Sequence, residues 1–344
     1  SGLEYAIYEN TTGKYVQADS SLDTGAIWQT TASWGTVTVT GLSSPVAQYF
    51  FQIKSRNTSD PLDASSSESS LSSAGSIAGT APEIALDSYA QTTNGTKYVT
   101  INYTGTDAEN DTSSLVAYEY SANGSTWSTM TEKSGVGSDG ISSLAFTSGG
   151  ANLVFAWDVD TDLSNTEDST VYVRLQANDG ASDGNLATSS AFVIDTKASV
   201  VSNFSAVQTA GATDVDIAYD LADDTASSIS IELDISDDAG STWTVTDTTV
   251  SGDVGVGVTT GASKAIVWSA ATDFDAQYES DMQVRLRATD DYGNVSSYFE
   301  SSEFTLDTSD PSLTNVTAAQ SAGSNNVIIS YDLSDDTTPN LTVE

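Results

Sequence analysis

The residues of this chain best suited to chemistry are carboxylates, which gather in short groups between runs that alternate apolar and polar side chains. Oxygen ligands of this kind suit Ca²⁺, which takes six to eight of them. Two alternatives stay open: solvated acidic loops in a protein adapted to high salt, and a catalytic carboxylate pair. The candidate metal ligands are Asp107, Glu109, Asp158, Asp160, Asp162, Asp179, Asp195, Asp223, Asp224, Asp273, Asp275, Asp290, Asp291, Asp307, Asp310, Asp335 and Asp336.

The composition excludes most other chemistry. The 344 residues include no Cys and no His, so thiolate nucleophiles, Ser-His-Asp triads and His-metal centres are ruled out. Lys and Arg together number 10 against 48 Asp and Glu, which gives a formal charge of −38. No basic stripe is therefore left to bind nucleic acid or an anionic membrane surface. We predict that the chain is not an enzyme.

Two kinds of targeting segment are missing from the sequence. No apolar run approaches the roughly 18 residues that span a bilayer, so we expect no membrane insertion in this segment. No basic segment followed by an apolar one opens the sequence, as a signal peptide would require. We expect a mature exported protein, or an excerpt of one.

Asparagine-linked glycosylation is the second chemistry that the sequence offers. The Asn-X-Ser/Thr pattern occurs about twice as often as chance would produce in a chain this rich in Ser and Thr. We expect N-linked glycans, although accidental sequons stay an alternative. The candidate sites are Asn10, Asn57, Asn94, Asn102, Asn110, Asn123, Asn203, Asn294, Asn315 and Asn340.

The elements that must position these groups recur as an internal repeat. Residues 215–224 (VDIAYDLADD) return 112 positions later as residues 327–336 (VIISYDLSDD), and residues 99–103 are a more distant copy. Arg174 precedes Arg285 by 111 positions in the same sequence context. Because such landmarks keep their order along the chain, the repeat is a whole domain of about 112–116 residues.

Each landmark is a short run with a period of two residues. Val99, Ile101 and Tyr103 would face one way, and the residues between them the other. Such runs return every 8–15 residues, separated by Gly, Asn, Asp and Ser, which is typical of an all-β sandwich. Helical periodicity is nowhere sustained, so we expect almost no helix.

The repeat starts and stops in the middle of a domain, because Glu4 aligns with Glu119, Glu232 and Glu344. We predict a partial domain at 1–58 (the back half) and a Ser-rich linker at 59–81. Complete sandwiches follow at 82–197 and 198–309, and a partial domain (the front third) at 310–344. Either the chain is a window of a longer array, or the front third of one copy completes the back half of another by strand donation.

Two segments carry a family resemblance. Residues 36–57 (TVTVTGLSSPVAQYFFQIKSRN) resemble the late strands of a fibronectin type III domain, in which a Leu and a Pro precede a Tyr; here Leu42 and Tyr49 lie one residue further apart than usual. The complete repeats resemble Ig-like and cadherin-like surface repeats of bacteria and archaea, through residues 106–111 (TDAEND) and 178–180 (NDG). The resemblance implies an extracellular protein of tandem Ig-like or fibronectin type III-like β-sandwich domains arranged head to tail.

A third resemblance concerns a turn. Residues 236–243 (SDDAGSTW) match the Asp-box pattern of sialidase-like propellers, and residues 121–127 are a shorter copy. In that motif Asp and Gly form a hairpin turn and the Trp packs beneath it. We predict a structural turn here, because four Arg in the whole chain cannot easily supply a cluster for a substrate carboxylate.

A sandwich predicts where the acidic groups lie. Its B–C and F–G loops share the leading end, and its E–F loop lies at the trailing end. Residues 107–109, 179, 223–224, 290–291 and 335–336 would lie at leading ends, and residues 158–162 and 273–275 at trailing ends. With sandwiches stacked head to tail, Asp195, Asp307 and Asp310 would lie between the two sets. We therefore expect Ca²⁺ at the domain junctions, bound more weakly around Asp107 and Asp179.

The predicted function is structural. We expect an extracellular surface protein, a rod of Ig-like repeats in an S-layer, fibre or stalk, stiffened by calcium and glycosylated. Its partners would be copies of itself or neighbouring repeats of the same chain, with cell-surface glycans as a further candidate. Two alternatives stay open: an adhesin that binds glycans or a protein through exposed loops, and the spacer domains of a large secreted enzyme.

Overall fold

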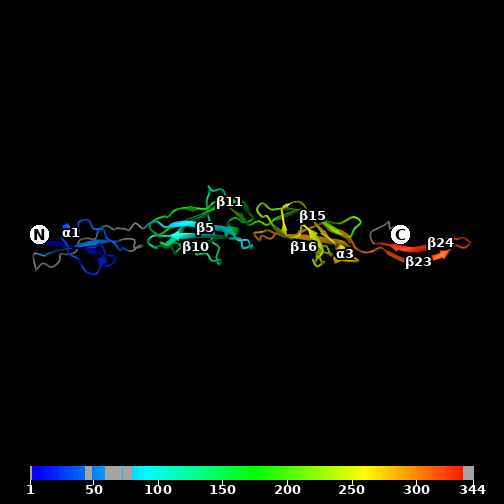
Figure 1. Cartoon of the computed structure of the whole chain (residues 1–344), viewed down its shortest axis with the longest axis horizontal. Helices are drawn as coiled ribbons and strands as arrows, with labels where there is room; N and C mark the ends of the chain where they lie inside the picture. The colour runs from blue at the N-terminus through cyan, green and yellow to red at the C-terminus, as the bar shows by residue number, and fades with distance from the viewer. Residues whose placement is uncertain (1, 43–48, 59–71, 73–79, 336–344) are drawn as a thin grey trace. The chain divides into compact units, whose positions relative to one another are not determined.

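The computed structural model describes residues 2–42, 49–58, 72 and 80–335, which are built largely of β-strands (Figure 1). Within these residues the helices are three short ones of four residues each, α1 (Thr31–Trp34), α2 (Val159–Asp162) and α3 (Ala270–Asp273). The strands pair into antiparallel sheets. The predicted all-β fold of Ig-like or fibronectin type III-like sandwiches is confirmed.

The chain divides into two compact units. Unit 1 contains residues 1–89, 100–157 and 172–191. Unit 2 contains residues 90–99, 158–171 and 192–344. Unit 2 therefore combines the second sandwich with those segments of the first that lead into it.

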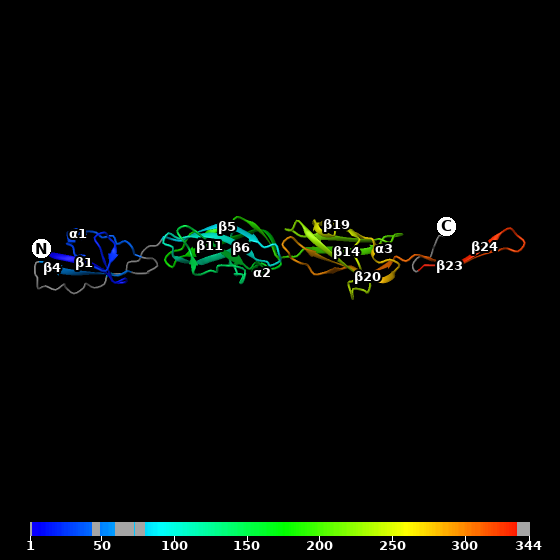
Figure 2. The same ribbon diagram turned by 60° about the horizontal axis from the view of Figure 1, so that its bottom comes forward.

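The first sandwich, around residues 83–195, has two sheets (Figures 1 and 2). One has the strand order β10-β6-β5, and the other has the order β12-β11-β7-β8, with β13 paired to β11 and β9 paired to β7. The strands are β5 (Glu83–Gln91), β6 (Val99–Thr106), β7 (Thr112–Ser121), β8 (Ser128–Thr129), β9 (Leu144–Ala145), β10 (Ala151–Trp157), β11 (Glu167–Asn178), β12 (Ala187–Thr188) and β13 (Phe192–Asp195).

The second sandwich repeats this plan. Its sheets have the orders β14-β15-β19-β17 and β18-β16-β20-β21, and β22 also pairs with β20. The strands are β14 (Val200–Gln208), β15 (Val215–Ala222), β16 (Ile229–Ser236), β17 (Val250–Gly252), β18 (Gly255–Val258), β19 (Gly261–Trp268), β20 (Tyr278–Thr289), β21 (Phe299–Glu300) and β22 (Phe304–Asp307).

Period-two alternation builds both cores. In β6 the inward residues Val99, Ile101 and Tyr103 have no exposed surface, and every second residue of β15 is likewise buried. The inner faces of the second sandwich meet around Trp268, which is fully buried. Alternate residues of a strand point to opposite faces of its sheet, so this pattern gives each sheet one apolar face.

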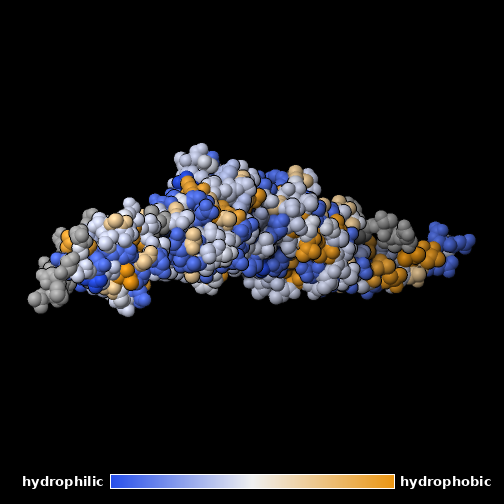
Figure 3. Space-filling view, turned by 60° about the vertical axis from the view of Figure 1, so that its left-hand side comes forward, coloured by the Kyte–Doolittle hydropathy of each residue, from blue (hydrophilic) through white to orange (hydrophobic). Residues whose placement is uncertain are grey.

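The segments before and after the sandwiches each contribute one sheet among the described residues. Strands β1 (Leu3–Glu9), β2 (Lys14–Val16), β3 (Leu22–Asp23) and β4 (Phe51–Asn57) form a sheet of order β3-β2-β1-β4. Strands β23 (Ser312–Gln320) and β24 (Val327–Ser334) form a hairpin with apolar surface (Figure 3). The domain boundaries themselves stay predictions.

A register comparison corrects one detail of the repeat alignment. In the three sheets an Arg lies directly opposite a carboxylate on the neighbouring strand and hydrogen-bonds to it; the pairs are Arg56–Glu4, Arg174–Glu119 and Arg285–Asp234. The counterpart of Glu119 is therefore Asp234. The alignment with Glu232 was wrong by two residues, because strand alternation returns an acid to the same face at that spacing.

A Trp completes each of these pairs. The guanidinium of Arg174 lies 4.1 Å from the ring centre of Trp127, and Arg285 lies 4.4 Å from Trp243. In the Asp-box segment, Asp238 accepts hydrogen bonds from the backbone and hydroxyl of Thr242. The segment forms the predicted turn, with its Trp held against an Arg that is itself paired to an acid.

Candidate metal centre

Carboxylates from four strand ends meet within unit 2. Glu167 begins β11 and Asp195 ends β13, and the two residues are opposite each other in the sheet. Asp223 follows β15, and Asp290 follows β20. One carboxylate oxygen from each of Glu167, Asp195 and Asp223 lies within 4.8 Å of the other two. This set, together with Asp290 and Asn294, is called the Asp195 cluster.

Asp195 is the centre of the cluster and has no exposed surface. Its Oδ1 accepts hydrogen bonds from the backbone N–H of Lys197 (3.0 Å) and from Nδ2 of Asn294 (3.1 Å). Its Oδ2 accepts one from the hydroxyl of Thr225. The ammonium of Lys197 pairs with Glu167. These contacts fix both carboxylate oxygens while leaving them close to other acids.

The electrostatics of the cluster disfavour its own negative charge. Burial raises the pKa of Asp195 to about 6, against the hydrogen bonds from Thr225 and Lys197. Burial also raises the pKa of Asp290, and Asp223 adds repulsion to both groups. A bound divalent cation would relieve both effects, because it replaces lost hydration and screens carboxylates from one another.

Asn294 gives a second sign that the cluster suits a cation. Its Nδ2 lies 2.9–3.2 Å from three oxygens, the carbonyl and Oδ1 of Asp195 and Oδ2 of Asp290. Its Oδ1 is buried and has no hydrogen-bond partner. An amide N–H₂ has two protons for these three acceptors. Rotating the amide by half a turn would add its oxygen to the set, which is favourable only when a cation is bound there.

Glycines let two loops approach within this unit. The N–H of Gly95 donates to the carbonyl of Tyr292 (3.0 Å). A Cβ added to Gly293 would lie 2.4 Å from the backbone nitrogen of Gly95. Only glycine permits this contact, which brings residues 92–97 against the loop that carries Asp290 and Asn294.

The equivalent loops of the first sandwich also carry buried acids. Asp107 and Asp179 occupy the positions of Asp223 and Asp290, and they are 2% and 7% exposed. Oδ1 of Asp107 accepts from the backbone of Glu109 and Asp111. Oδ1 of Asp179 accepts from the N–H groups of Ala181 and Ser182, as in an Asx turn. Glu109 instead points to Thr80, which donates to it.

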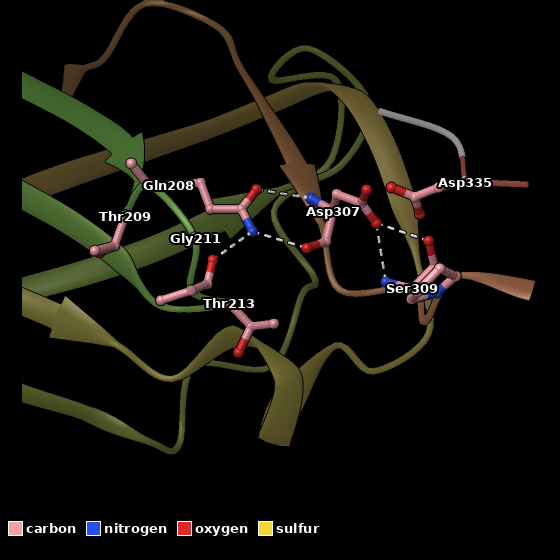
Figure 4. Close-up of a pocket in the computed structure, with 10 residues that line it drawn as sticks. Gln208, Thr209, Gly211, Thr213, Asp307, Ser309 and Asp335 are labelled. Carbon is pink, nitrogen blue, oxygen red and sulfur yellow. Dashed lines mark hydrogen bonds between the residues drawn. The ribbon is translucent and has the colours of Figure 1, made fainter. Parts of the chain in front are cut away.

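The second junction repeats part of the arrangement. The amide of Gln208 both donates to the carbonyl of Asp307 and accepts from its N–H, as Gln91 does with Asp195 (Figure 4). Asp307 and Asp335 line a cavity of about 400 Å³ with Gln208 and Ser309. Tyr278 lies opposite Asp307, where Glu167 lies opposite Asp195. This junction therefore lacks one carboxylate of the Asp195 cluster.

Several predicted ligands lie elsewhere. The two oxygens of Asp273 accept hydrogen bonds from Thr248, Thr249 and the indole of Trp268 and so anchor the E–F loop. Asp160 pairs with Lys97 at 3.5 Å. The remaining members are half-buried at α2 (Asp158 and Asp162), exposed (Asp224, Asp275, Asp291 and Asp310) or outside the described residues (Asp336).

Sequence reasoning missed Glu167, Gln91 and Asn294 as parts of this cluster. Glu167 opens a strand and is not part of an acidic loop, so its role depends on the pairing of β11 with β13. Asn294 was read as a sequon. The available signal was the spacing of Gln91 and Gln208, each of which precedes its junction Asp by about 100 residues.

The structure separates the sequons by exposure. Asn10, Asn94, Asn110, Asn123, Asn203 and Asn315 are exposed, Asn57 and Asn102 are half-buried, and Asn340 lies outside the described residues. Asn294 is 1% exposed and its Nδ2 is hydrogen-bonded to two acids. The glycosylation prediction is wrong for Asn294, because the folded chain leaves no room for a sugar on that nitrogen.

Comparisons with known proteins give no family. No family model matches the sequence, and neither does any curated protein. Among solved structures, the FN1–FN3 domains of chicken CNTN1 align with a TM-score of 0.30 and 11% identity, over 90% of each chain. A mutant of Salmonella alpha-2-macroglobulin aligns with a TM-score of 0.19 and 9% identity, over 93% of this chain and 22% of that one. In the described residues, no helix has the length and apolar character to cross a membrane.

Proposed function

We propose that this chain is a structural extracellular protein whose tandem β-sandwiches are held together by Ca²⁺, as part of an S-layer, fibre or stalk. The observation that carries the proposal is the Asp195 cluster, in which a fully buried carboxylate lies within 4.8 Å of two others. Asp195 and Glu167 belong to the first sandwich, and Asp223 belongs to the second. One ion bound to all three would fix the angle between the sandwiches.

The donor set fits Ca²⁺. Glu167, Asp195, Asp223 and Asp290 offer carboxylate oxygens, and Asn294 and the carbonyl of Asp195 offer neutral ones, which matches the hard oxygen ligands that Ca²⁺ prefers. The chain has no Cys or His, so a soft or imidazole-bound metal is disfavoured. Binding only the folded form would stabilise it by about 2.7 kcal/mol at a free concentration of about 100 times Kd.

The test is thermal unfolding of the whole chain in calcium and in chelator, at matched ionic strength. We expect calcium to raise the melting temperature of the wild type and to raise that of Asp195→Asn much less. Asp275→Asn is the matched control, because Asp275 is exposed and should leave the calcium response unchanged. A wild-type melting temperature that is the same in both buffers would refute the proposal.

The surface location is tested separately by glycans. The exposed turn residues Asn94 and Asn123 are the strongest candidates for N-linked sugar. Mass spectrometry of native material should find glycans on these residues and none on Asn294. An intact native mass equal to that of the bare polypeptide would remove the glycan part of the proposal.

A further inference from the structure

Buried polar atoms without a hydrogen-bond partner gather at one end of the first sandwich. Among the described residues, these atoms include Oδ2 of Asp107, Oγ of Ser113, Oδ2 of Asp179 and Oγ of Ser182. Buried polar groups are normally satisfied, and unpaired ones are costly. Two of these atoms carry carboxylate charge, which makes the cost greater.

The fold brings these four atoms into one neighbourhood of unit 1. Asn178 is opposite Ser114 in the β11–β7 ladder, so Asp179 lies beside Ser113. The N–H of Ser182 donates to Asp179. The loop between Asp107 and β7 is closed by the hydrogen bond from Asp111, two residues before Ser113. The free oxygens therefore come from the B–C and F–G loops of one sandwich.

In the second sandwich the equivalent carboxylate oxygens have hydrogen-bond donors that the first sandwich lacks. There, Oδ2 of Asp223 accepts from the hydroxyl of Ser199 (2.8 Å), and Oδ2 of Asp290 accepts from Nδ2 of Asn294 (2.9 Å). Bridges Asn178–Asp183 and Thr289–Val295 close the two F–G loops, so Ser182 stands where Asn294 stands in the second sandwich. The first sandwich offers hydroxyl oxygens where the second offers an amide donor.

We propose that the first sandwich has a cation site of its own, at which Oδ2 of Asp107, Oδ2 of Asp179 and the hydroxyl of Ser113 bind one Ca²⁺. The ligands are all oxygens, as Ca²⁺ requires. Each of these atoms exposes less than 1 Å², so a side chain of another protein does not reach them. Ser182 is placed to contribute a fourth ligand. The site needs no second sandwich and is therefore independent of the Asp195 cluster.

The experiment counts calcium ions bound to the whole chain by equilibrium dialysis. Asp107→Asn with Asp179→Asn keeps both Oδ1 acceptors of the loop hydrogen bonds while removing the charge. We expect this double variant to lose one ion relative to the wild type and to keep the ion that Asp195→Asn loses. Equal binding by the double variant and the wild type would overturn the site, whatever the result for Asp195.

Melting temperatures show whether Asp107 and Asp179 bind the ion or only support their loops. In chelator the double variant should melt no lower than the wild type, because an unpaired buried charge has been removed, and in calcium it should melt lower. A lower melting temperature in both buffers, with the calcium response intact, would mean that these residues only support the loops. If the double variant does not fold, Ser113→Ala is measured instead. We expect it to weaken the Kd of this site at least tenfold, and an unchanged Kd would overturn the proposal.

Discussion

The leading ends of the two sandwiches have the same acids and different partners. Asp107 and Asp223 follow equivalent strands, as do Asp179 and Asp290, and Oδ1 of each closes its own loop. In the second sandwich the other oxygens receive donors from Ser199 and Asn294, while in the first they do not. The comparison teaches that loop acids alone do not define a site. Hydrogen-bond donors on the surrounding residues decide whether the second oxygen of each acid has a partner.

The largest expected effect comes from removing the donor. Asn294→Ala would leave Asp195 and Asp290 without the amide that contacts both, and hydrogen bonds to buried charged groups contribute about 1.5–3 kcal/mol each. We expect a loss of about 3–5 kcal/mol in the free energy of unfolding in chelator, measured by denaturant titration. Ser182→Ala is the matched control and should change it by less than about 0.5 kcal/mol, because that hydroxyl has no partner. Equal losses for the two variants would break the comparison.

A pH series in chelator tests the burial of Asp195. Its folded pKa of about 6 lies above the value of 3.8 for an unperturbed Asp, so the folded state holds a proton more tightly than the unfolded state. This contribution is present below about pH 4 and is lost as the pH rises through about 6, on the order of 3 kcal/mol.

Burial also raises the pKa of Asp290 beside it, so the pH dependence of the wild type alone does not isolate Asp195. The measured quantity is therefore the difference between the wild type and Asp195→Asn at each pH. We expect the wild type to lose stability relative to the variant between pH 4 and pH 7. A constant difference would show that Asp195 is ionised throughout.

Calcium should stabilise the leading ends of both sandwiches. At about 100 times Kd it would stabilise each site-bearing sandwich by about 2.7 kcal/mol. Hydrogen exchange followed by mass spectrometry would report the two separately. We expect protection to rise around residues 107–113 and 179–182 as well as around residues 223–226 and 290–294. Protection confined to the second pair of segments would leave the first sandwich without a site.

The smallest expected effect comes from giving the first sandwich a residue of the second. Ser182→Asn would give the first sandwich the residue that the second one uses as a donor. We expect it to add about 1 kcal/mol to the stability in chelator, the net value of one hydrogen bond. It should also weaken calcium binding at the first sandwich, because an amide proton then competes for Asp179. Stability and affinity that both fall would show that the F–G loop of the first sandwich cannot accommodate the longer side chain.

The all-β architecture could be predicted from the sequence, but only part of the candidate metal centre could. Alternation in residues 99–103 and the repeat spacing were enough for the sandwich fold, because both depend on local pattern. Asp195, Asp223 and Asp290 were also visible as acids after strands. Glu167 was not, since its position depends on β11 pairing with β13. The sequon at Asn294 suggested a glycan on a residue that is buried, because a three-residue pattern contains no information on burial.

The arginines described with the sheets determine how this chain meets other acidic molecules. Arg56, Arg174, Arg285 and Arg287 are each bound to a carboxylate of their own sheet. The formal charge of the chain is −38, so its surface is strongly anionic. The four guanidinium groups are already paired with carboxylates of the same sheet. Two such surfaces repel over a distance set by the solution, about 10 Å in 0.1 M salt and about 3 Å in 1 M salt. If the chain packs side by side with copies of itself, as the proposed function requires, that packing would depend on ionic strength and on divalent ions.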